Sequence, residues 1–462
     1  MKIYNTLSGK KEILKPIKGK KINMFVCGPT VYDYSHIGHA RLFVTFDVFV
    51  KYLRARGYKV FYLQNITDLD DKIIARAREK KVPPKDLAEA FKKEYFKDMK
   101  ALSVDSVTKY ADATKYIKEI IGQVKRLEKK GYAYKIEGDG VYYDISKFKN
   151  YGKLAGRTAL AAEDAVTRID YSSKKRNRGD FCLWKFKQEE SEPNWKSPWG
   201  QGRPGWHIED TAITEKFFGP QYDIHGGARE LLFPHHQAEV SQMEAISDKK
   251  PMVKYWMHAG VLTVNGQKMS KSLGNFIIIN DFIRRYSVVQ LRFLIVKNLW
   301  SSPLDYSDSV MIEVKSALVK IEELLRKLQT TNYKLQTNTK LIKKFKENFY
   351  AQLDDNFNTP KAFAVLFEFI KKINELLDKN LISKRDANEI YKFFEEINSI
   401  FGIIDFKKVN AEIPGKIKKL ANEREKFRKQ QNWQKSDELR AEIEKRGFTV
   451  EDTPSGPAIK QI

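Results

Sequence analysis

Residues 24–41, MFVCGPTVYDYSHIGHAR, connect a predicted strand to a predicted helix. Upstream, residues 21–26 alternate apolar and polar side chains and meet Gly28-Pro29-Thr30, which predicts a short strand ending in a turn. Downstream, apolar residues recur at helical spacing from Leu42 to Leu53, and Gly57 closes the predicted helix. A second predicted strand at 58–64 completes a strand–helix–strand unit, which is typical of a parallel sheet.

The rest of the chain predicts a parallel sheet that is interrupted and then followed by helices. A β-rich pattern begins near Gly138, and the tract 189–205 is so rich in proline and glycine that we expect irregular loops there. The α/β pattern resumes at YDIHGG, residues 222–227, with a helix beginning near Pro234. We therefore expect an insertion of roughly 80 residues between two halves of the sheet. Amphipathic helices follow from about Met311, and Thr359-Pro360 predicts a cap and a first-turn proline.

Composition narrows the class of protein. Lys and Arg number 84 against 59 Asp and Glu, a net charge of +25, which suits a polyanionic partner such as nucleic acid. A lysine-rich proteome is the alternative explanation. Two cysteines cannot form a disulfide framework, so we expect a reduced, cytoplasmic protein. The lysine-rich N-terminus has no apolar segment after it, and no apolar run reaches the roughly 18 residues of a membrane helix.

Two short motifs are suited to phosphate chemistry. His36, Gly38 and His39 stand where the predicted helix begins, and a helix start offers free backbone N–H groups and a positive dipole end to a polyphosphate. Lys268-Met269-Ser270-Lys271 lies on a glycine-flanked loop, where two lysines can neutralise charge on a leaving pyrophosphate. Taken singly, the motifs could equally be structural histidines and a solvated basic loop.

In this order, the two motifs resemble the HIGH and KMSKS signatures of class I aminoacyl-tRNA synthetases. Longer stretches resemble the cysteinyl-tRNA synthetase family from Tyr4 to about Thr453: CGPTVYDYSHIGHAR, NITDLDDKII, DFCLWK, SPWGQGRPGWHIE, FPHHQAE, KMSKSLGN and DDNFNTPKA. The resemblance implies an α/β fold, with a split Rossmann-like parallel sheet, an inserted domain, an α-helical bundle and a small C-terminal anticodon-binding domain. The implied boundaries are 1–120 and 206–262 for the two Rossmann halves, 121–205 for the insert, 263–310 for the KMSKS-bearing linker, 311–405 for the bundle and 406–462 for the C-terminal domain.

The resemblance also implies the reaction. The protein would activate L-cysteine with ATP to cysteinyl-adenylate, release pyrophosphate, and transfer cysteine to the 3′-terminal adenosine of tRNA(Cys), with Mg²⁺ bound alongside ATP. His36 and His39 would contact phosphates, and Lys268 and Lys271 would stabilise the developing charge. Other ATP contacts would come from Gly38, Met269, Ser270, His225, Gly226 and Gly227. Ala228 and Glu230 replace a glycine and an aspartate of the family, so Glu230 would reach the ribose with one extra methylene.

A zinc ion is the third implication. The family holds one Zn²⁺ with two cysteines, a histidine and a glutamate, and this metal takes the substrate sulfur as thiolate more readily than the serine hydroxyl. Cys27, His235 and Glu239 fall on three of these positions, and Asp210 replaces the second cysteine. Aspartate can ligate zinc. We expect a site that the substrate sulfur completes, and the alternative is a weakened site that loses its metal.

Further expectations concern the remaining residues. Thr67 and Trp206 would line the cysteine pocket, although they could instead be a helix cap and core packing. Cys182 should be buried packing. Arg424, Arg428, Trp433, Arg440 and Asp452 lie in the part that resembles the anticodon-binding domain, where a solvated basic helix is the alternative. The rival functions are an ATP-dependent ligase joining cysteine to an amino sugar and a non-catalytic tRNA-binding paralogue, and we expect a monomer.

Overall fold

The computed structural model describes residues 1–156, 172–190, 192–270, 273–331, 338–453 and 456–461. These residues form two compact units, Met1–Ile404 and Asp405–Ile462. Among the described residues, every helix is too short or too polar to span a bilayer.

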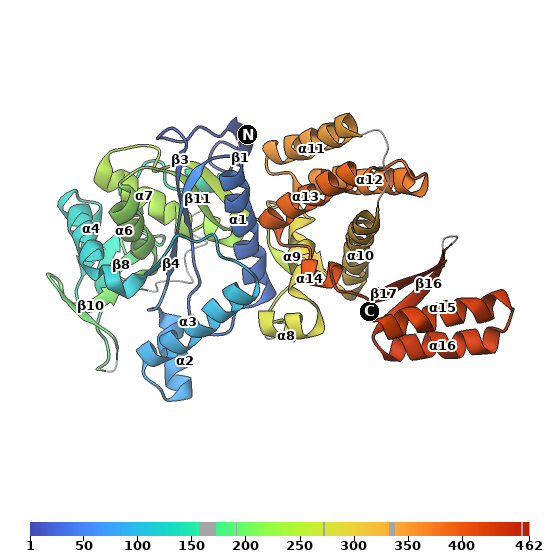
Figure 1. Ribbon diagram of the computed structural model, residues 1–462. Helices are drawn as coiled ribbons and strands as arrows, with labels where there is room; N and C mark the ends of the chain where they lie inside the picture. Colours follow the sequence, from blue (N-terminus) through green and yellow to red (C-terminus); the bar gives the residue numbers. More distant parts are fainter. Residues whose placement is uncertain (157–171, 191, 271–272, 332–337, 454–455, 462) are drawn as a thin grey trace. The chain divides into compact units, whose positions relative to one another are not determined.

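A five-stranded parallel sheet is the centre of the first unit (Figure 1). In spatial order its strands are β12 (Val253–Ala259), β11 (Tyr222–Ala228), β3 (Lys21–Val26), β4 (Lys59–Ile66) and β5 (Lys109–Asp112). The chain runs from β3 to β5 in one direction and then returns to the other side of β3 with β11. The order therefore reverses between β3 and β11, which is where open parallel sheets bind their ligands, beyond the carboxyl ends of the strands.

Helices cover both faces of this sheet. Figure 1 shows α1 (Ile37–Ala55) on one side of the strands and α6 (Trp206–Phe218) and α7 (His235–Ser247) on the other. The ring of Phe46 on α1 packs so closely on β11 that a side chain at Gly226 would collide with it. The predicted strand at 21–26 is confirmed, and the helix after it ends at Ala55, two residues before Gly57.

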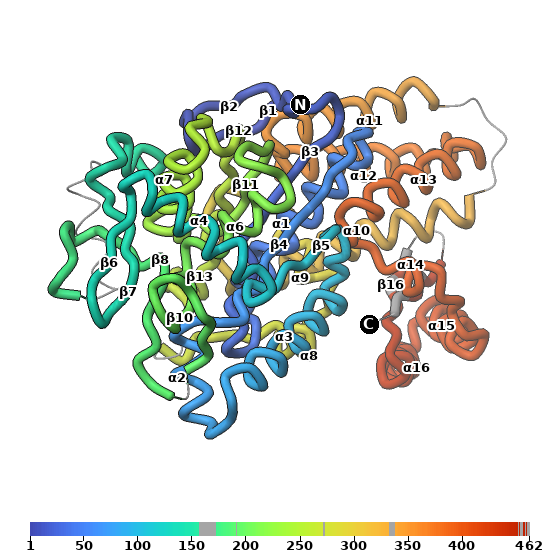
Figure 2. The backbone as a smooth tube through the Cα atoms, turned by 90° about the vertical axis from the view of Figure 1, so that its left-hand side faces the viewer, coloured from blue at the N-terminus to red at the C-terminus, as the bar shows by residue number. Residues whose placement is uncertain are grey.

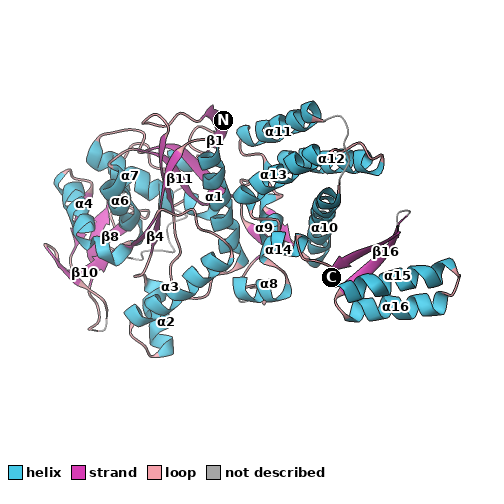
Figure 3. Ribbon diagram, viewed as in Figure 1, coloured by secondary structure: helices cyan, strands magenta, loops and turns pink. Residues whose placement is uncertain are grey.

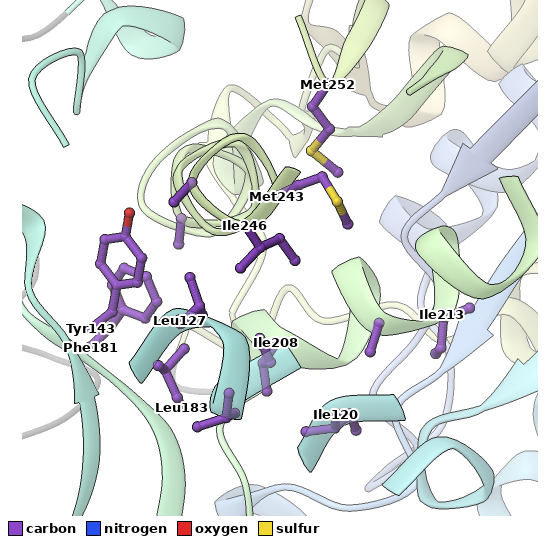
Figure 4. Close-up of a cluster of buried hydrophobic side chains, with 14 of the residues drawn as sticks. Ile120, Leu127, Tyr143, Phe181, Leu183, Ile208, Ile213, Met243, Ile246 and Met252 are labelled. Carbon is purple, nitrogen blue, oxygen red and sulfur yellow. The ribbon is translucent and has the colours of Figure 1, made fainter. Parts of the chain in front are cut away.

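An apolar core fixes α6 and α7 in place. Figure 4 shows Ile208 and Ile213 of α6 and Met243 and Ile246 of α7 among side chains of α4 (Ile117–Lys129) and of two antiparallel strands. Leu127 and Leu183 are completely buried there. Because burying one such side chain stabilises the fold by about 1.5–3 kcal/mol, this core holds the helices that carry the candidate metal ligands in a fixed position.

The insertion between β5 and β11 is an antiparallel sheet (Figure 3). Its strands, in spatial order, are β6 (Ala133–Ile136), β7 (Gly140–Tyr143), β8 (Phe181–Phe186), β10 (Gly200–Pro204) and β9 (Trp195–Ser197). The prediction of irregular loops over 189–205 is wrong at β9 and β10. Gly200, at φ +122°, makes the turn between these strands, and Gly202 lies so close to Lys185 of β8 that a Cβ would collide with its carbonyl. Glycine here permits close strand pairing rather than preventing it.

Further short elements complete the first unit. Two helices lie between β4 and β5, and a hairpin opens the chain: α2 (Asp71–Lys80), α3 (Pro84–Ala101), β1 (Lys2–Asn5) and β2 (Lys10–Ile13). After β12 come a small sheet and two helices: β13 (Leu262–Val264), β14 (Gln267–Lys268), β15 (Leu304–Tyr306), α8 (Ile279–Arg285) and α9 (Val288–Val296).

Four helices then form the bundle, seen from another side in Figure 2. They are α10 (Asp308–Thr330), α11 (Thr339–Asp354), α12 (Thr359–Asp378) and α13 (Lys384–Phe401). The predicted cap is one residue off, because Asn358 rather than Thr359 accepts the hydrogen bond from the Lys361 N–H. Arg292 of α9, which is completely buried, joins the bundle to α1: it donates to the Phe401 carbonyl at 2.7 Å and to Asp47 Oδ2 at 3.1 Å.

The second unit is built on a helical pair and a hairpin. Its elements are α14 (Phe406–Val409), α15 (Gly415–Lys429), α16 (Trp433–Lys445), β16 (Phe448–Thr453) and β17 (Gly456–Gln461). Its small core consists of Ile417, Ala421, Ile443 and Val450.

Candidate active site and metal centre

A cavity of about 430 Å³ lies at the carboxyl ends of β3, β4 and β11, where the strand order reverses. Most of the predicted site residues line it: Cys27, His36, Gly38, His39, Thr67, Trp206, Asp210, Glu230, His235, Lys268 and Met269. Residues from distant parts of the sequence therefore meet at one cavity, which three of the candidate metal ligands share with the two phosphate motifs.

The two histidines of the first motif are locked into the start of α1. His36 is the N-cap residue, and its Nδ1 accepts a hydrogen bond from the Gly38 N–H at 3.0 Å. The Nδ1 of His39 accepts from the His36 N–H at 3.2 Å, and the two rings stack with centroids 3.9 Å apart. Burial of the His39 ring lowers its pKa, and repulsion from the neighbouring His36 lowers it further. The imidazole of His39 is therefore neutral at pH 7.

The second motif contacts the first directly. Gly38 lies so close to the His36 ring and to the methyl carbon of Met269 that an added Cβ would approach them to 2.7 and 3.4 Å. The N–H of Ile37 donates to the Ile277 carbonyl at 3.0 Å, and Met269 Sδ accepts from the Ile277 N–H at 3.4 Å. The chain just beyond the lysine-bearing loop is thus hydrogen-bonded to the start of α1.

Lys268 and Glu230 form an ion pair across the cavity mouth. Their Nζ and Oε1 atoms are 2.6 Å apart, although the two side chains are 81% and 52% exposed. Ser270 is anchored by its N–H, which donates to Asn275 Oδ1 at 2.8 Å. Lys271 lies outside the described residues, so its predicted role stays a prediction. The predicted ribose contact of Glu230 also stays a prediction, and the structure gives this carboxylate a lysine partner instead.

The four predicted metal ligands converge on one point. Cys27, Asp210, His235 and Glu239 are buried, and each offers a ligand atom within 4.8 Å of the others. His235 Nε2 lies 3.0 Å from Asp210 Oδ2 and 3.2 Å from Glu239 Oε1. Within the described part of the chain, Asp210 Oδ1 and both oxygens of Glu239 have no hydrogen-bond partner. Buried carboxylate oxygens without a donor fit a cation, because burying them unpaired is costly.

The pKa shifts of the acidic groups in this cluster also favour a bound cation. Burial, followed by the charges of Asp210 and Glu239, raises the pKa of the Cys27 thiol. Burial and Asp210 likewise raise the pKa of Glu239. Three acidic groups that repel one another when ionised are stabilised together by a divalent cation, which binds the ionised forms of all three.

Five of the seven histidines of the chain gather around these ligands: His207, His225, His235, His236 and His258. Sequence reasoning assigned only His235 to the metal and missed His236, the second residue of the FPHH doublet. Burial lowers the pKa values of His207, His225 and His236, so these imidazoles are neutral. The scarcity of histidine elsewhere in the chain was the available signal.

Thr67 and Trp206 lie on the cavity wall as expected. Asp70, not Thr67, caps α2, so the helix-cap alternative is wrong for Thr67. Thr67 Oγ1 accepts a hydrogen bond from Asn65 Nδ2 at 3.2 Å. The Trp206 ring stacks on His235 with centroids 4.3 Å apart, which fixes the orientation of that ligand.

Three predicted ATP contacts lie behind the cavity wall. His225 is completely buried, with its ring stacked on Trp256, and a Cβ on Gly227 would collide with the His236 ring. Their role toward ATP stays a prediction, because the observed packing already accounts for a small residue at Gly226 and Gly227. Cys182 is buried as expected, among Tyr134, Ile136 and Tyr142.

In the second unit, only some of the predicted contacts are free to meet RNA. Arg424 is buried and forms two hydrogen bonds with Asp452, at 2.5 and 3.1 Å, so this pair supports the unit itself. Arg428 is bound to Glu425 at 2.7 Å, and Arg440 adds positive charge near Asp452. Trp433 is 58% exposed, an unusual position for an indole and one suited to base stacking.

Comparison with known proteins agrees with this geometry. Residues 13–316 match the family model "tRNA synthetases class I (C) catalytic domain", and residues 348–405 match the DALR domain. A cysteine–tRNA ligase of Thermococcus gammatolerans is 41% identical over 479 residues, covering 100% of this chain and 99% of the relative. One of Coxiella burnetii is 42% identical over 469 residues, covering 100% of both chains.

The chain belongs to the cysteine–tRNA ligase family. Its fold is the class I synthetase fold, a parallel α/β sheet followed by a helical region. A solved structure of Mycobacterium tuberculosis methionyl-tRNA synthetase in complex with methionyl-adenylate superposes with a TM-score of 0.61 at 12% identity, covering 82% of this chain and 88% of that one. At this identity the likeness shows the fold alone.

Proposed function

We propose that this protein is a cysteine–tRNA ligase, which activates L-cysteine with ATP to cysteinyl-adenylate and transfers cysteine to the 3′-terminal adenosine of tRNA(Cys). One observation carries the proposal: a single cavity joins Cys27, Asp210 and His235 to the His36–His39 pair and Lys268. A ligand spanning the cavity would have its sulfur at the metal ligands and its carboxylate near the phosphates, as adenylate formation requires.

The phosphate side of the cavity would act by positioning and by charge. The cysteine carboxylate is itself the nucleophile, so the reaction needs no protein base. His36 and His39, fixed by their hydrogen bonds to the start of α1, would hold the phosphates in line with that carboxylate. Lys268 and Lys271, together with Mg²⁺ bound to ATP, would neutralise the charge that develops on pyrophosphate.

The metal side of the cavity would select cysteine. Cys27, Asp210, His235 and Glu239 fit Zn²⁺, because one sulfur, one imidazole nitrogen and two carboxylate oxygens are all zinc ligands. Bound zinc supplies a Lewis acid that favours the thiolate of cysteine over the hydroxyl of serine. Thr67 and Trp206 would hold the backbone part of the amino acid. Asp210 in place of a cysteine keeps the negative charge and removes one soft ligand, which leaves Cys27 the only protein thiolate in the set.

Partners and organisation complete the proposal. The protein would work as a cytoplasmic monomer, consistent with two buried thiols that form no disulfide. The two Rossmann halves, 1–120 and 206–262, and the linker 263–310 would carry the chemistry. The bundle, 311–405, and the C-terminal part, 406–462, would hold tRNA, with Trp433 stacking on an unpaired base.

Two coupled assays test this function. Cysteine-dependent ATP–pyrophosphate exchange measures activation, and charging of a total tRNA pool measures transfer. We expect both activities, with charging confined to tRNA(Cys). Exchange without charging would favour the amino-sugar ligase, and the absence of exchange would leave a tRNA-binding paralogue.

Trp433→Ala separates the two steps. It should raise the KM for tRNA about 5- to 160-fold, because stacking on one base contributes roughly 1–3 kcal/mol, while pyrophosphate exchange stays unchanged. Ile13→Ala is a matched control, since Ile13 is also an exposed large side chain, at 56% exposure, but belongs to the first unit. An unchanged KM for tRNA in Trp433→Ala would remove Trp433 from the RNA-binding surface.

A further inference from the structure

The buried cluster offers two complete ligand sets rather than one. The pocket-facing set is Cys27, Asp210, His235 and Glu239, and the inner set is Cys27, His225, His236 and Glu239. Every member is buried, and the ligand atoms of each set lie within 4.8 Å of one another. Cys27 and Glu239 belong to both sets, so the two sets compete for these ligands.

The geometry of the inner set fits a tetrahedral ion. His236 Nε2 lies 3.1 Å and His225 Nε2 lies 3.4 Å from the Cys27 sulfur. Zinc bonds of about 2.0–2.3 Å place neighbouring tetrahedral ligands roughly 3.3–3.6 Å apart. The Cys27 sulfur therefore stands close to the required spacing from both imidazoles, and Glu239 offers a carboxylate oxygen within 4.8 Å of the other ligand atoms.

Outer hydrogen bonds direct the free electron pairs of both histidines toward Cys27. His236 Nδ1 is 2.8 Å from His258 Nε2, and His258 Nδ1 is 2.8 Å from Thr6 Oγ1, so a proton on each Nδ1 can be donated outward along this chain. His225 Nδ1 is 2.7 Å from the Tyr222 hydroxyl, whose oxygen can accept a hydrogen bond from the Nδ1–H in the same way. Both Nε2 atoms are then unprotonated, as metal ligation needs, and such outer partners typically fix the tautomer of a zinc-bound histidine.

The two sets differ in their access to the cavity. Cys27, Asp210 and His235 line the cavity, whereas His225 and His236 lie behind it against Trp256. An ion in the inner set would have four protein ligands and no open position, which is the arrangement of a structural zinc site. The inner set has two imidazoles and one carboxylate, whereas the pocket-facing set has one imidazole and two carboxylates. The inner set is therefore the softer of the two, and zinc, an ion of borderline softness, binds imidazole well.

We propose that the chain has a second zinc site, the inner set, which excludes occupancy of the pocket-facing set and holds the ion when no cysteine is bound. The replacement of a cysteine by Asp210 weakens the pocket-facing set, and the thiolate of the substrate restores a second sulfur there. Binding of cysteine then draws the ion to the cavity wall. This inference rests on the proposed function, because it assumes that zinc binds the sulfur of the substrate.

Three double variants separate the sets. Asp210→Asn/His235→Gln removes the ligands unique to the pocket-facing set, His225→Gln/His236→Gln removes those unique to the inner set, and Cys27→Ser/Glu239→Gln removes the shared pair. After dialysis against a zinc buffer, we expect about one zinc per chain in the wild type and in each of the first two variants. The third should retain less than about a tenth of that, and it also reports any zinc bound adventitiously to exposed groups. Circular dichroism and thermal melting identify a variant that has lost its fold.

The outcome discriminates between the sites. If Asp210→Asn/His235→Gln is folded and as metal-free as the shared-pair variant, the inner site does not exist and the inference fails, while the proposed function stands. If His225→Gln/His236→Gln alone loses its zinc, the ion uses only the inner set, which overturns both the exchange between sites and the pocket-facing assignment.

Cobalt spectroscopy gives a readout independent of activity. In the Co²⁺-loaded wild type, adding cysteine should roughly double the thiolate-to-metal charge-transfer absorbance, because a second sulfur joins Cys27. In Asp210→Asn/His235→Gln, cysteine should leave the spectrum unchanged, since the ion is confined to the inner set. An equal response in both proteins would overturn the movement of the ion.

Discussion

The metal side and the phosphate side of the cavity are built in opposite ways. The candidate metal ligands are buried on α6, α7 and just after β3, and hydrogen bonds to neighbouring rings hold His235 and His236. On the phosphate side, Lys268 is 81% exposed and its described ion-pair partner is the half-exposed Glu230. The difference teaches that the fold fixes the proposed amino-acid side in advance and leaves the lysine of the proposed ATP side exposed.

The free-energy cost of losing a side chain also differs between the metal side and the phosphate side. Removing one member of a buried charged cluster leaves the others uncompensated, at a cost of about 3–5 kcal/mol. An exposed ion pair such as Lys268 with Glu230 contributes at most about 1 kcal/mol, and less at high salt. Substitutions on the two sides should therefore differ strongly in magnitude.

Cys27→Ser should have the largest effect, because Cys27 is the only sulfur in either ligand set. We expect zinc content to fall to background and cysteine-dependent pyrophosphate exchange to fall more than about 100-fold, since even outer partners of a metal typically cost 10- to 100-fold. Cys182→Ser is the matched control, as Cys182 is buried in another cluster. Stoichiometric zinc in Cys27→Ser would contradict the metal assignment.

His39→Ala should separate chemistry from metal binding. Losing a preorganised contact to the reacting phosphates should lower kcat of pyrophosphate exchange by about 10²–10³-fold, with zinc content unchanged. Metal analysis and exchange on the same preparation measure both. A loss of zinc would mean that the two sides of the cavity are not independent.

Gly38→Ala tests how closely the two phosphate motifs must approach. The new Cβ would lie 2.7 Å from His36 Cε1 and 3.4 Å from the Met269 methyl, so the His36 ring has to shift. We expect kcat to fall about 10- to 100-fold, as for other small misplacements of reacting groups. Gly122→Ala is the control, because a Cβ there meets nothing within 4 Å on helix α4, and it should leave kcat unchanged. Equal kcat values for the two variants would contradict the close approach.

Glu230→Gln should have the smallest effect, and the direction in which it changes the KM for ATP is informative. Releasing Lys268 from its ion pair should lower the KM for ATP about two- to five-fold, an advantage that fades with added salt. Initial rates at varied ATP and two salt concentrations measure it. A higher KM would instead assign Glu230 to the ribose.

Local patterns in the sequence were sufficient for much of the fold. The strand at 21–26 and the helix after it follow from apolar spacing and a closing glycine, which are signals within a few residues. The β9–β10 hairpin was missed because Gly202 serves a contact with β8, a strand that is close in space only. His236 was missed for the same reason, since the sulfur it faces is 209 residues away in sequence.

The hydrogen bonds of Arg292 set a limit on how the chain can be dissected. The family models divide it into residues 13–316 and 348–405, which suggests that the catalytic part could be isolated. A fragment ending before Phe401 would leave a buried guanidinium without that carbonyl, at a cost of about 1–3 kcal/mol. A fragment ending at residue 316 would also expose Phe49 and Tyr52 of α1, whose rings pack on Phe357. The smallest autonomous catalytic fragment of this chain therefore extends through the end of α13.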